Sequence, residues 1–286
     1  MRRTLNPIYP PAAIQKEYEK RLKKAIREME KSVVYWLLAK YKANEDLIVD
    51  SAVDNLLKEF RRLLKQWTRN FNKLCETLPR WFVSKIRGYV TNNLVQQTKP
   101  LRDAGLGFNL EFSYMSRKER QAFAAIVKEN VNLIKNRLMR DSLTQVEGIV
   151  LRSIENGHDL STLTKELHKQ FGVTERRAAM IARDQTHKAT ENLARARLKS
   201  YGINRGIWVH TPSGKTYRKT HIDILDGKEY DLEEGLYDPA KGVERKIHPA
   251  ELVNCYCVFR PLIPTLSEEE TEAGIEEIFE ELGEKV

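Results

Sequence analysis

The reactive side chains of this sequence gather in its C-terminal third. The stretch THIDILDGKEYDL (residues 220–232) contains His221 and an Asp226-Gly227 pair, and HPAELVNCYC (residues 248–257) contains His248, Cys255 and Cys257. The whole chain of 286 residues has only six histidines and three cysteines. This concentration predicts either a functional site or a staple that holds a small domain together.

Metal binding is the first chemistry that these residue types suggest. His221, His248, Cys255 and Cys257 are all ligand types that zinc accepts, and small β-rich modules often need a metal to hold together. The Cys-x-Cys spacing is shorter than the usual one, so both thiolates reach one ion only if Tyr256 points away, as alternation along a strand would make it do. The alternative is that the cysteines are small buried hydrophobes and the histidines are satisfied surface groups.

Catalysis is the second possibility. His221 with Asp223 or Asp226 and a cysteine would imitate a Cys-His-Asp nucleophilic site. The carboxylates of Asp223, Asp226, Glu229 and Asp231 would suit a magnesium-dependent nuclease, although an acidic turn on the surface explains them equally. The sequence has neither a nucleophile elbow nor the glycine-rich phosphate motifs of ATPases and dinucleotide enzymes. We therefore expect no enzyme, name no catalytic residue, and retain a metal-dependent hydrolase as the alternative.

The N-terminal part of the chain must be helical. Residues 1–11 predict an extended arm, and the apolar residues from Ile14 to Leu37 recur at steps of three or four, which predicts an amphipathic helix from Ala12. Further helices are expected over residues 46–75 and 80–97, separated by Pro79.

Glycines and capping residues predict where the later helices begin and end. Residues 105–114 interrupt the helical pattern, and Ser116 with Glu119 forms a capping-box pattern that opens a helix. Ser142 with Gln145 repeats that pattern, and Gly157 is placed to end the helix. A short helix from Ser161 to Gly172 and a longer one from Thr174 to about Gly202 are expected next.

After Gly202 the pattern changes to short β-formers between turn residues, with a final strand that Pro261 stops. The predicted fold class is α+β, with a predominantly helical N-terminal body, a small β-rich C-terminal module and an acidic helical tail. The predicted domains are the arm (1–11), a helical domain (12–157), a domain of helices followed by short strands (158–264) and the tail (265–286).

Charge is distributed unevenly along the chain. The net charge is +9, but the tail from Ser267 contains nine acids and one lysine, a charge of −8, which leaves +17 for residues 1–266. So basic a body suggests a polyanionic partner such as double-stranded DNA. No run of about 20 apolar residues predicts a membrane span, and the N-terminus lacks the apolar core of a secretory signal, so we expect no membrane partner.

The ordered motifs of the C-terminal region resemble the Mu F-like minor head proteins of tailed bacteriophages. The motifs are IARDQTHKATENLARARLKSYGI (residues 181–203), a tryptophan, SGKTYRKTH (residues 213–221), DGKEYD (residues 226–231) and NCYC (residues 254–257), and the resemblance covers roughly residues 150–262. The residues that match the family pattern outside the metal candidates are Arg183, Thr186, Trp208, Arg218, Gly227 and Asn254. Two positions depart from it: Tyr256 stands where the family commonly has arginine, and Ala250 follows Pro249 where it commonly has glycine.

The resemblance implies a virion protein, made in the bacterial host cytoplasm and located inside the capsid at the portal vertex. Its implied partners are the portal protein and other virion proteins, with non-specific contact to double-stranded DNA as a further expectation. A DNA-binding protein without portal contact is the alternative. His248 falls outside the family pattern, so the metal ligands expected are His221, Cys255 and Cys257, completed by Asp226 or water, with zinc as the only candidate cofactor.

Overall fold

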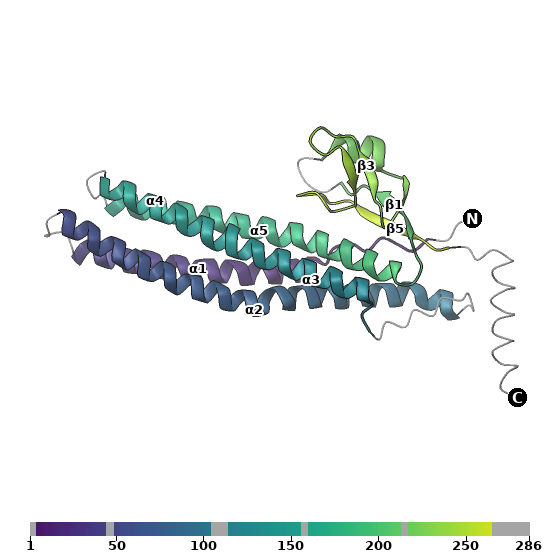
Figure 1. Cartoon of the computed structure of the whole chain (residues 1–286), viewed down its shortest axis with the longest axis horizontal. Helices are drawn as coiled ribbons and strands as arrows, with labels where there is room; N and C mark the ends of the chain where they lie inside the picture. Colours follow the sequence, from purple (N-terminus) through teal and green to yellow (C-terminus); the bar gives the residue numbers. More distant parts are fainter. Residues whose placement is uncertain (1–3, 44–48, 104–113, 156–159, 213–216, 265–286) are drawn as a thin grey trace, which may run out of the picture. The chain divides into compact units, whose positions relative to one another are not determined.

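The computed structural model describes residues 4–43, 49–103, 114–155, 160–212 and 217–264. Its elements divide between two compact units. The first unit comprises residues 1–8, 93–116 and 194–286, and the second comprises residues 9–92 and 117–193. Figure 1 shows a helical body and a small group of strands that follows it in sequence, which confirms the predicted α+β class.

Long amphipathic helices build the second unit. They are α1 (Ala12–Ala43), most of α2 (Val49–Asp103), α3 (Arg117–Asn132), a π-helical segment η1 (Leu133–Arg140), α4 (Asp141–Glu155) and most of α5 (Leu160–Lys199). The predicted start of the first helix at Ala12 is confirmed, and so is a helix that opens after Ser116. The apolar face of α1 is fully buried from Tyr18 to Leu37 at steps of three or four residues.

Three predicted helix boundaries are wrong. Pro79 lies inside α2, Ser142 lies inside α4, and Gly172 lies inside α5. In each case the buried face continues across the position, as it does on α2 from Phe71 through Leu78 to Phe82. Burial of several large side chains outweighs the roughly 3 kcal/mol that an interior proline costs. Two predictions lie outside the described residues: the helix end at Gly157, and the interruption over residues 105–114, of which only Tyr114 is described.

A buried chain of polar side chains links the helices of the second unit. Tyr18 Oη donates to Asn130 Oδ1 at 2.9 Å, and Asn130 Nδ2 donates to Gln185 Oε1 at 2.9 Å. Gln185 Nε2 in turn donates to Glu129 Oε1 at 2.9 Å. Tyr18 also stacks on Phe82 of α2, with ring centroids 4.1 Å apart. The network therefore joins α1, α3 and α5, where an apolar core alone would leave their register less defined.

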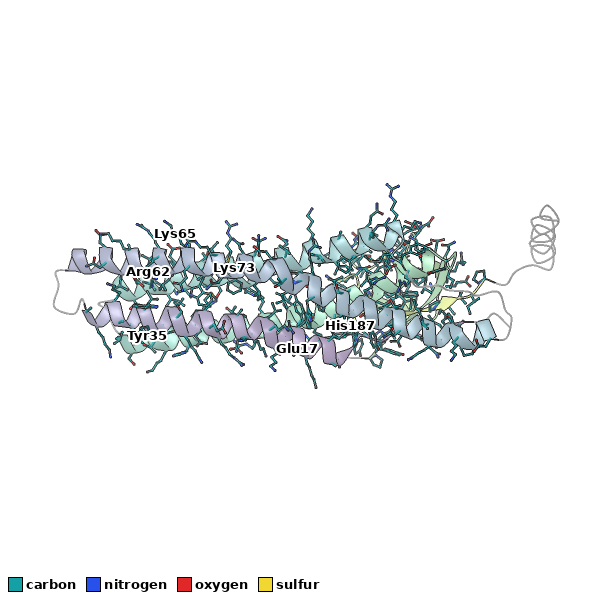
Figure 2. The ribbon with its side chains drawn as sticks, turned by 90° about the horizontal axis from the view of Figure 1, so that it is seen from below. Glu17, Tyr35, Arg62, Lys65, Lys73 and His187 are labelled. Carbon is teal, nitrogen blue, oxygen red and sulfur yellow. The ribbon has the colours of Figure 1, made fainter. Side chains whose placement is uncertain are left out.

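The charged surface of the second unit differs from helix to helix. On α1 the bases pair with acids one turn away, as in Arg21–Glu17, Lys23–Glu19 and Lys24–Glu28. On α2, by contrast, every exposed residue from 58 to 73 is lysine, arginine or asparagine. Figure 2 labels Arg62, Lys65 and Lys73 along this part of α2. One helix face thus contributes a continuous basic stripe.

The first unit contains the strands. A three-stranded antiparallel sheet has the order β2 (Glu229–Asp231), β1 (Arg205–Val209), β5 (Val258–Leu262), and β3 (Leu236–Asp238) pairs with β4 (Arg245–Ile247). A π-helical turn, η2 (His221–Leu225), precedes β2. The arm is placed by Thr4, which bridges to Leu262, and by Leu5, whose N–H donates to Pro261 O at 3.1 Å.

The small β-rich module is therefore confirmed, with local differences. Pro261 lies within β5 and does not stop it, and Cys255 and Cys257 lie in the loop before that strand. The expected alternation around Tyr256 along a strand is therefore absent. The domain division predicted after residue 157 coincides with none of the positions at which the chain passes from one unit to the other. One of these positions lies inside α5, which contributes residues to both units. The predicted tail lies outside the described residues. No helix among the described residues is long and apolar enough to cross a membrane.

Candidate metal centre

Four short segments of the first unit bring reactive side chains together. His210 directly follows β1, His221 opens η2, Asp238 ends β3, and Cys255 and Cys257 precede β5. The pairing of β1 with β5 matches Val209 to Val258, so the next antiparallel positions are His210 and Cys257. Strand register thus sets the histidine against the cysteine from the far end of the module.

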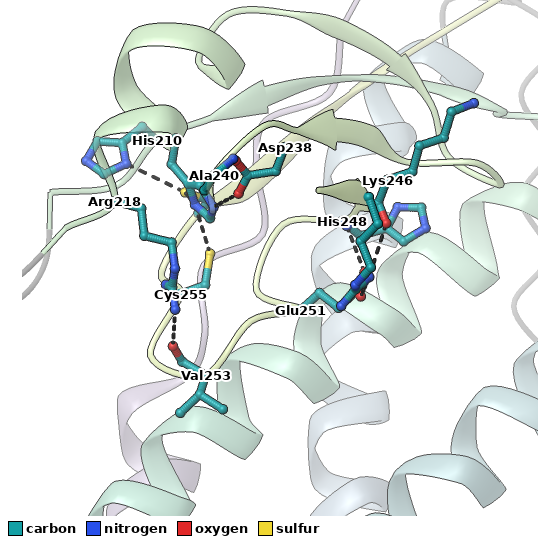
Figure 3. Close-up of polar contacts among 12 residues, drawn as sticks. His210, Arg218, Asp238, Ala240, Lys246, His248, Glu251, Val253 and Cys255 are labelled. Carbon is teal, nitrogen blue, oxygen red and sulfur yellow. Dashed lines mark hydrogen bonds and ion pairs between the residues drawn. The ribbon is translucent and has the colours of Figure 1, made fainter. Parts of the chain in front are cut away.

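The imidazole of His221 lies at the centre of the group. Its Nδ1 is 3.5 Å from Cys255 Sγ and 3.5 Å from Cys257 Sγ, and the ligand atoms of these three buried residues all lie within 4.8 Å of one another. His210 Nδ1 approaches Cys257 Sγ at 3.6 Å. Figure 3 shows His210, Asp238 and Cys255 within one group of polar contacts. The three metal-ligand candidates shared by sequence and geometry are therefore His221, Cys255 and Cys257.

Asp238 fixes the orientation of the His221 ring. His221 Nε2 donates to Asp238 Oδ2 at 3.2 Å, and the other carboxylate oxygen accepts the Ala240 N–H at 2.9 Å. Asp238 is fully buried, so its side-chain oxygens require hydrogen-bond partners, and His221 and Ala240 supply them. With Nε2 protonated, Nδ1 presents a lone pair toward the two sulfurs. This is the carboxylate–histidine arrangement that orients histidine ligands in metal sites.

The two thiols affect each other strongly. The hydrogen bond from Cys257 lowers the pKa of Cys255 to about 4, against the opposing effect of burial. The same hydrogen bond and burial raise the pKa of Cys257, while the Trp208 indole N–H and the Thr211 backbone N–H act in the opposite direction. Both cysteines are free and buried. One sulfur of the pair is thus favoured as a thiolate.

Two residues proposed from the sequence do not join this group. The Asp226 side chain is exposed, and its Oδ1 accepts the His210 backbone N–H at 2.7 Å, so it shapes the turn before Gly227. The backbone N–H of His248 donates to Glu251 Oε2 at 2.9 Å, and the His248 ring has its centroid 6.2 Å from that of the Tyr230 ring. Figure 3 shows His248 and Glu251 as a separate set of contacts. Asp226 and His248 therefore lie outside the group of His221, Cys255 and Cys257.

The residues of the family pattern support the group from outside. Trp208 is fully buried, and its ring meets that of His221 edge to face with centroids 5.2 Å apart. Arg218 Nη2 donates to Val253 O at 3.1 Å, which ties the segment before η2 to the cysteine loop. Gly227 has φ +74° and Asn254 has φ +56°, so both occupy the left-handed region. Their roles are in backbone geometry.

Ala250 explains one departure from the family pattern. Its φ is +59°, which is left-handed backbone that glycine adopts without steric cost. The glycine common at this position in the family therefore fits the same turn, and alanine adopts it here at some cost in strain. Tyr256, the other departure, is half-buried between the two cysteines.

Arg183 and Thr186 lie on α5 in the second unit. Arg183 is exposed, whereas Thr186 is fully buried and its Oγ1 donates to Ala182 O at 2.7 Å. Between them in the motif, Gln185 is 1% exposed and belongs to the buried polar network. The helical part of the motif therefore serves packing of the helices.

The sequence interpretation missed His210, Asp238 and Gln185. His210 could have been found, because it is two residues after Trp208 and alternation places both on one face of the strand. Asp238 could not have been found, because it follows an exposed tyrosine and no local pattern distinguishes it from the many other acidic residues of the chain. Gln185 stands among apolar residues at helical spacing, which is a weak signal of a buried polar contact.

The geometry also resembles a Cys-His-Asp triad, with Asp238 in the orienting position. A nucleophile must reach its substrate, however, and Cys255 and Cys257 are 4% and 2% exposed. The nearby hollow lined by Gly202, Asn204, Arg205 and Glu229 contains no member of the cluster. Burial of both sulfurs suits a structural role better than catalysis.

Comparison with known proteins then bears on the same part of the chain. A family model described as phage Mu protein F like protein matches residues 144–260. Residues 144–260 form a Mu F-like region. This Mu F-like region includes the end of the helical unit and the whole cysteine–histidine cluster, and it confirms the resemblance inferred from the motifs.

A relative in Haemophilus influenzae, an uncharacterized protein, is 30% identical over 142 residues. The match covers 49% of this chain and 29% of the relative, so the chain spans less than a third of the length of that protein. No solved structure matches the chain.

Proposed function

We propose that this protein is a minor capsid protein of a tailed phage that acts in head morphogenesis. The observation that carries the proposal is the Mu F-like region over residues 144–260, together with the ordered motifs within it. The role is structural: the cluster residues are buried, and Gly227 and Asn254 of the family pattern adopt left-handed backbone conformations. No catalytic step is assigned to them.

The finer proposal is that the protein associates with the portal vertex and acts in head assembly, DNA packaging or DNA delivery. Long helices with one buried and one solvated face are suited to docking on a partner. The test is a pull-down of the purified chain with the portal protein of the same phage, below and above about 0.5 M salt, where surface charge interactions are screened. Capture that persists at high salt supports portal contact. Loss of capture at both salt concentrations contradicts it.

Contact with double-stranded DNA is proposed through the basic stripe on α2. The stripe consists of five residues at steps of three or four, which places them on one face of the helix. They are Lys58, Arg62, Lys65, Arg69 and Lys73. Arg62 is anchored by Glu59, which is mostly buried, and no exposed acid interrupts residues 58–73. Such a row neutralises successive phosphates without reading sequence.

This contact is measurable as the salt dependence of binding to random-sequence DNA. Replacing Lys58, Lys65, Arg69 and Lys73 with glutamine should lower the slope of log K against log salt by up to about 3.6, because each phosphate contact contributes about 0.9. A matched variant removes four exposed lysines from α1, Lys16, Lys20, Lys24 and Lys31. Equal losses in both variants would show that net charge alone binds DNA. A nuclease assay on the same samples tests the hydrolase alternative.

A further inference from the structure

The side chains around His221 form a more specific set than the sequence motif. We propose that the protein binds one zinc ion through His221, Cys255 and Cys257 with His210 as the fourth ligand, and that Asp238 positions His221 for this task. This proposal is independent of the function proposed above. It differs from the ligand set expected from the sequence, which had Asp226 or water in the fourth place.

The distances fit zinc. With Zn–S of about 2.3 Å and Zn–N of about 2.0–2.1 Å, tetrahedral angles place a sulfur and a nitrogen ligand about 3.5 Å apart. The three S···N separations in the cluster are 3.5, 3.5 and 3.6 Å, and they involve Cys255–His221, Cys257–His221 and Cys257–His210. Each is the length of one edge of a zinc tetrahedron.

The hydrogen-bonding capacity of His221 leads to the same conclusion. Its Nε2 proton is committed to Asp238, so Nδ1 has a single lone pair to share. Two sulfurs lie at the same distance from that one lone pair. A hydrogen bond satisfies only one of them, whereas a metal ion bonded to Nδ1 and both sulfurs satisfies all three.

Charge and position support His210 as the fourth ligand. Two thiolates and two neutral imidazoles balance the charge of Zn²⁺, which a buried site requires. His210 directly follows β1, where the register of β1 and β5 continues to Cys257, and its side chain is half-buried beside that cysteine. Nδ1 of His210 lies 3.6 Å from Cys257 Sγ but does not belong to the group of ligand atoms within 4.8 Å of one another, so a complete tetrahedron requires His210 to move toward His221 and Cys255 when zinc binds.

Such a centre would hold the module together. The ligands come from the end of β1, the start of η2 and the loop before β5, and these segments are separated by up to 47 residues. The strands that connect them are only three to five residues long. Small modules with so little regular structure commonly depend on a metal for stability.

The first experiment measures metal in the wild-type full chain, purified without chelator. Elemental analysis should give about one zinc per chain, and replacement by Co²⁺ should give the thiolate-to-cobalt charge-transfer band and the strong visible bands of a tetrahedral site. A strong chelator should lower the melting temperature, and added zinc should restore it. A zinc-free preparation with an unchanged melting temperature overturns the proposal without any variant.

Variants then test the ligand set by competition with a chromophoric chelator. His210→Ala and Asp238→Asn should each weaken zinc binding at least 10-fold, with one zinc still bound at saturation for Asp238→Asn. Asp226→Asn and His168→Ala, the latter in the second unit, should leave the affinity unchanged. Loss of zinc in Asp226→Asn with retention in His210→Ala would refute the assignment of His210, and zinc retained after Cys255→Ser and Cys257→Ser together would refute the site.

Discussion

The buried polar network of the helical unit gives a quantitative test of the packing described above. Replacing Asn130 with leucine removes the acceptor of the Tyr18 hydroxyl and the donor to Gln185, since both bonds go to this one side chain. Leucine has the same branching and the same number of side-chain heavy atoms as asparagine, so the main loss is polar. Each orphaned buried group costs about 1–3 kcal/mol. Gln185 keeps its bond to Glu129, which favours the lower part of that range for Gln185.

The free energy of unfolding should therefore fall by about 2–4 kcal/mol, measured by urea denaturation. Asn72→Leu is the matched control, because Asn72 is exposed on α2 and its replacement should change stability by about 0.5 kcal/mol or less. Tyr18→Phe completes a double-mutant cycle. Alone it should cost about 1–2 kcal/mol, because Asn130 loses a partner, but in the leucine background it should cost almost nothing.

The coupling energy in this cycle is the deciding quantity. A coupling of about 1 kcal/mol or more means that the two side chains stabilise the unit as a pair. Additive effects would mean that the bond between Tyr18 and Asn130 contributes nothing beyond packing, and the reasoning would be refuted.

Two further predictions concern the β-rich unit. Burial, with Arg195 adding to it, lowers the pKa of His248 to about 4, so between about pH 6.5 and pH 4 the unfolded chain binds a proton that the folded chain does not. The free energy of unfolding should therefore decrease by about 1–2 kcal/mol as the pH is lowered through this range, after allowance for partial solvent exposure. His248→Gln should flatten this part of the pH profile of stability, measured by urea denaturation. Gly235 and Gly242 have similar φ values, +82° and +83°, but a Cβ added at Gly235 would meet Ile247 O at 2.6 Å, whereas a Cβ at Gly242 would enter open space. Gly235→Ala should therefore lower the free energy of unfolding by at least about 1 kcal/mol more than Gly242→Ala, measured by urea denaturation. Equal losses of stability in the two variants would contradict the steric argument.

Local sequence patterns predicted the elements well where one interaction decided the outcome. The helix from Ala12 follows from apolar spacing, and the strands after Gly202 follow from β-formers between turn residues. Pro79, Ser142 and Gly172 were wrongly predicted as boundaries because each local preference is worth a few kcal/mol at most. The buried face that runs through each position contributes more, and it depends on helices distant in sequence.

The residues of the candidate site likewise differ in whether a local sequence pattern identifies them. His221 and the cysteine pair stand out by residue type, so the sequence alone identifies them. Asp226 is part of the motif that resembles the family, yet its carboxylate accepts the His210 backbone N–H and does not join the cluster. His210 and Asp238 enter the site only through strand pairing and chain reversal. Partners placed by tertiary structure have no signature in a linear pattern.

The limits of the Mu F-like region carry a consequence for how it folds. The match begins at residue 144, inside α4, and ends within β5, so it takes one part from each compact unit. Its helical part contains Gln185, whose buried partner Asn130 lies before the match and is itself bonded to Tyr18 of α1. Residues 144–193 therefore depend on α1 and α3 for a complete polar network and a covered apolar face. The cysteine–histidine cluster, by contrast, has its described partners, Trp208 included, within residues 208–257. A family defined by one continuous stretch thus joins a self-contained centre to a helix that requires the rest of the chain.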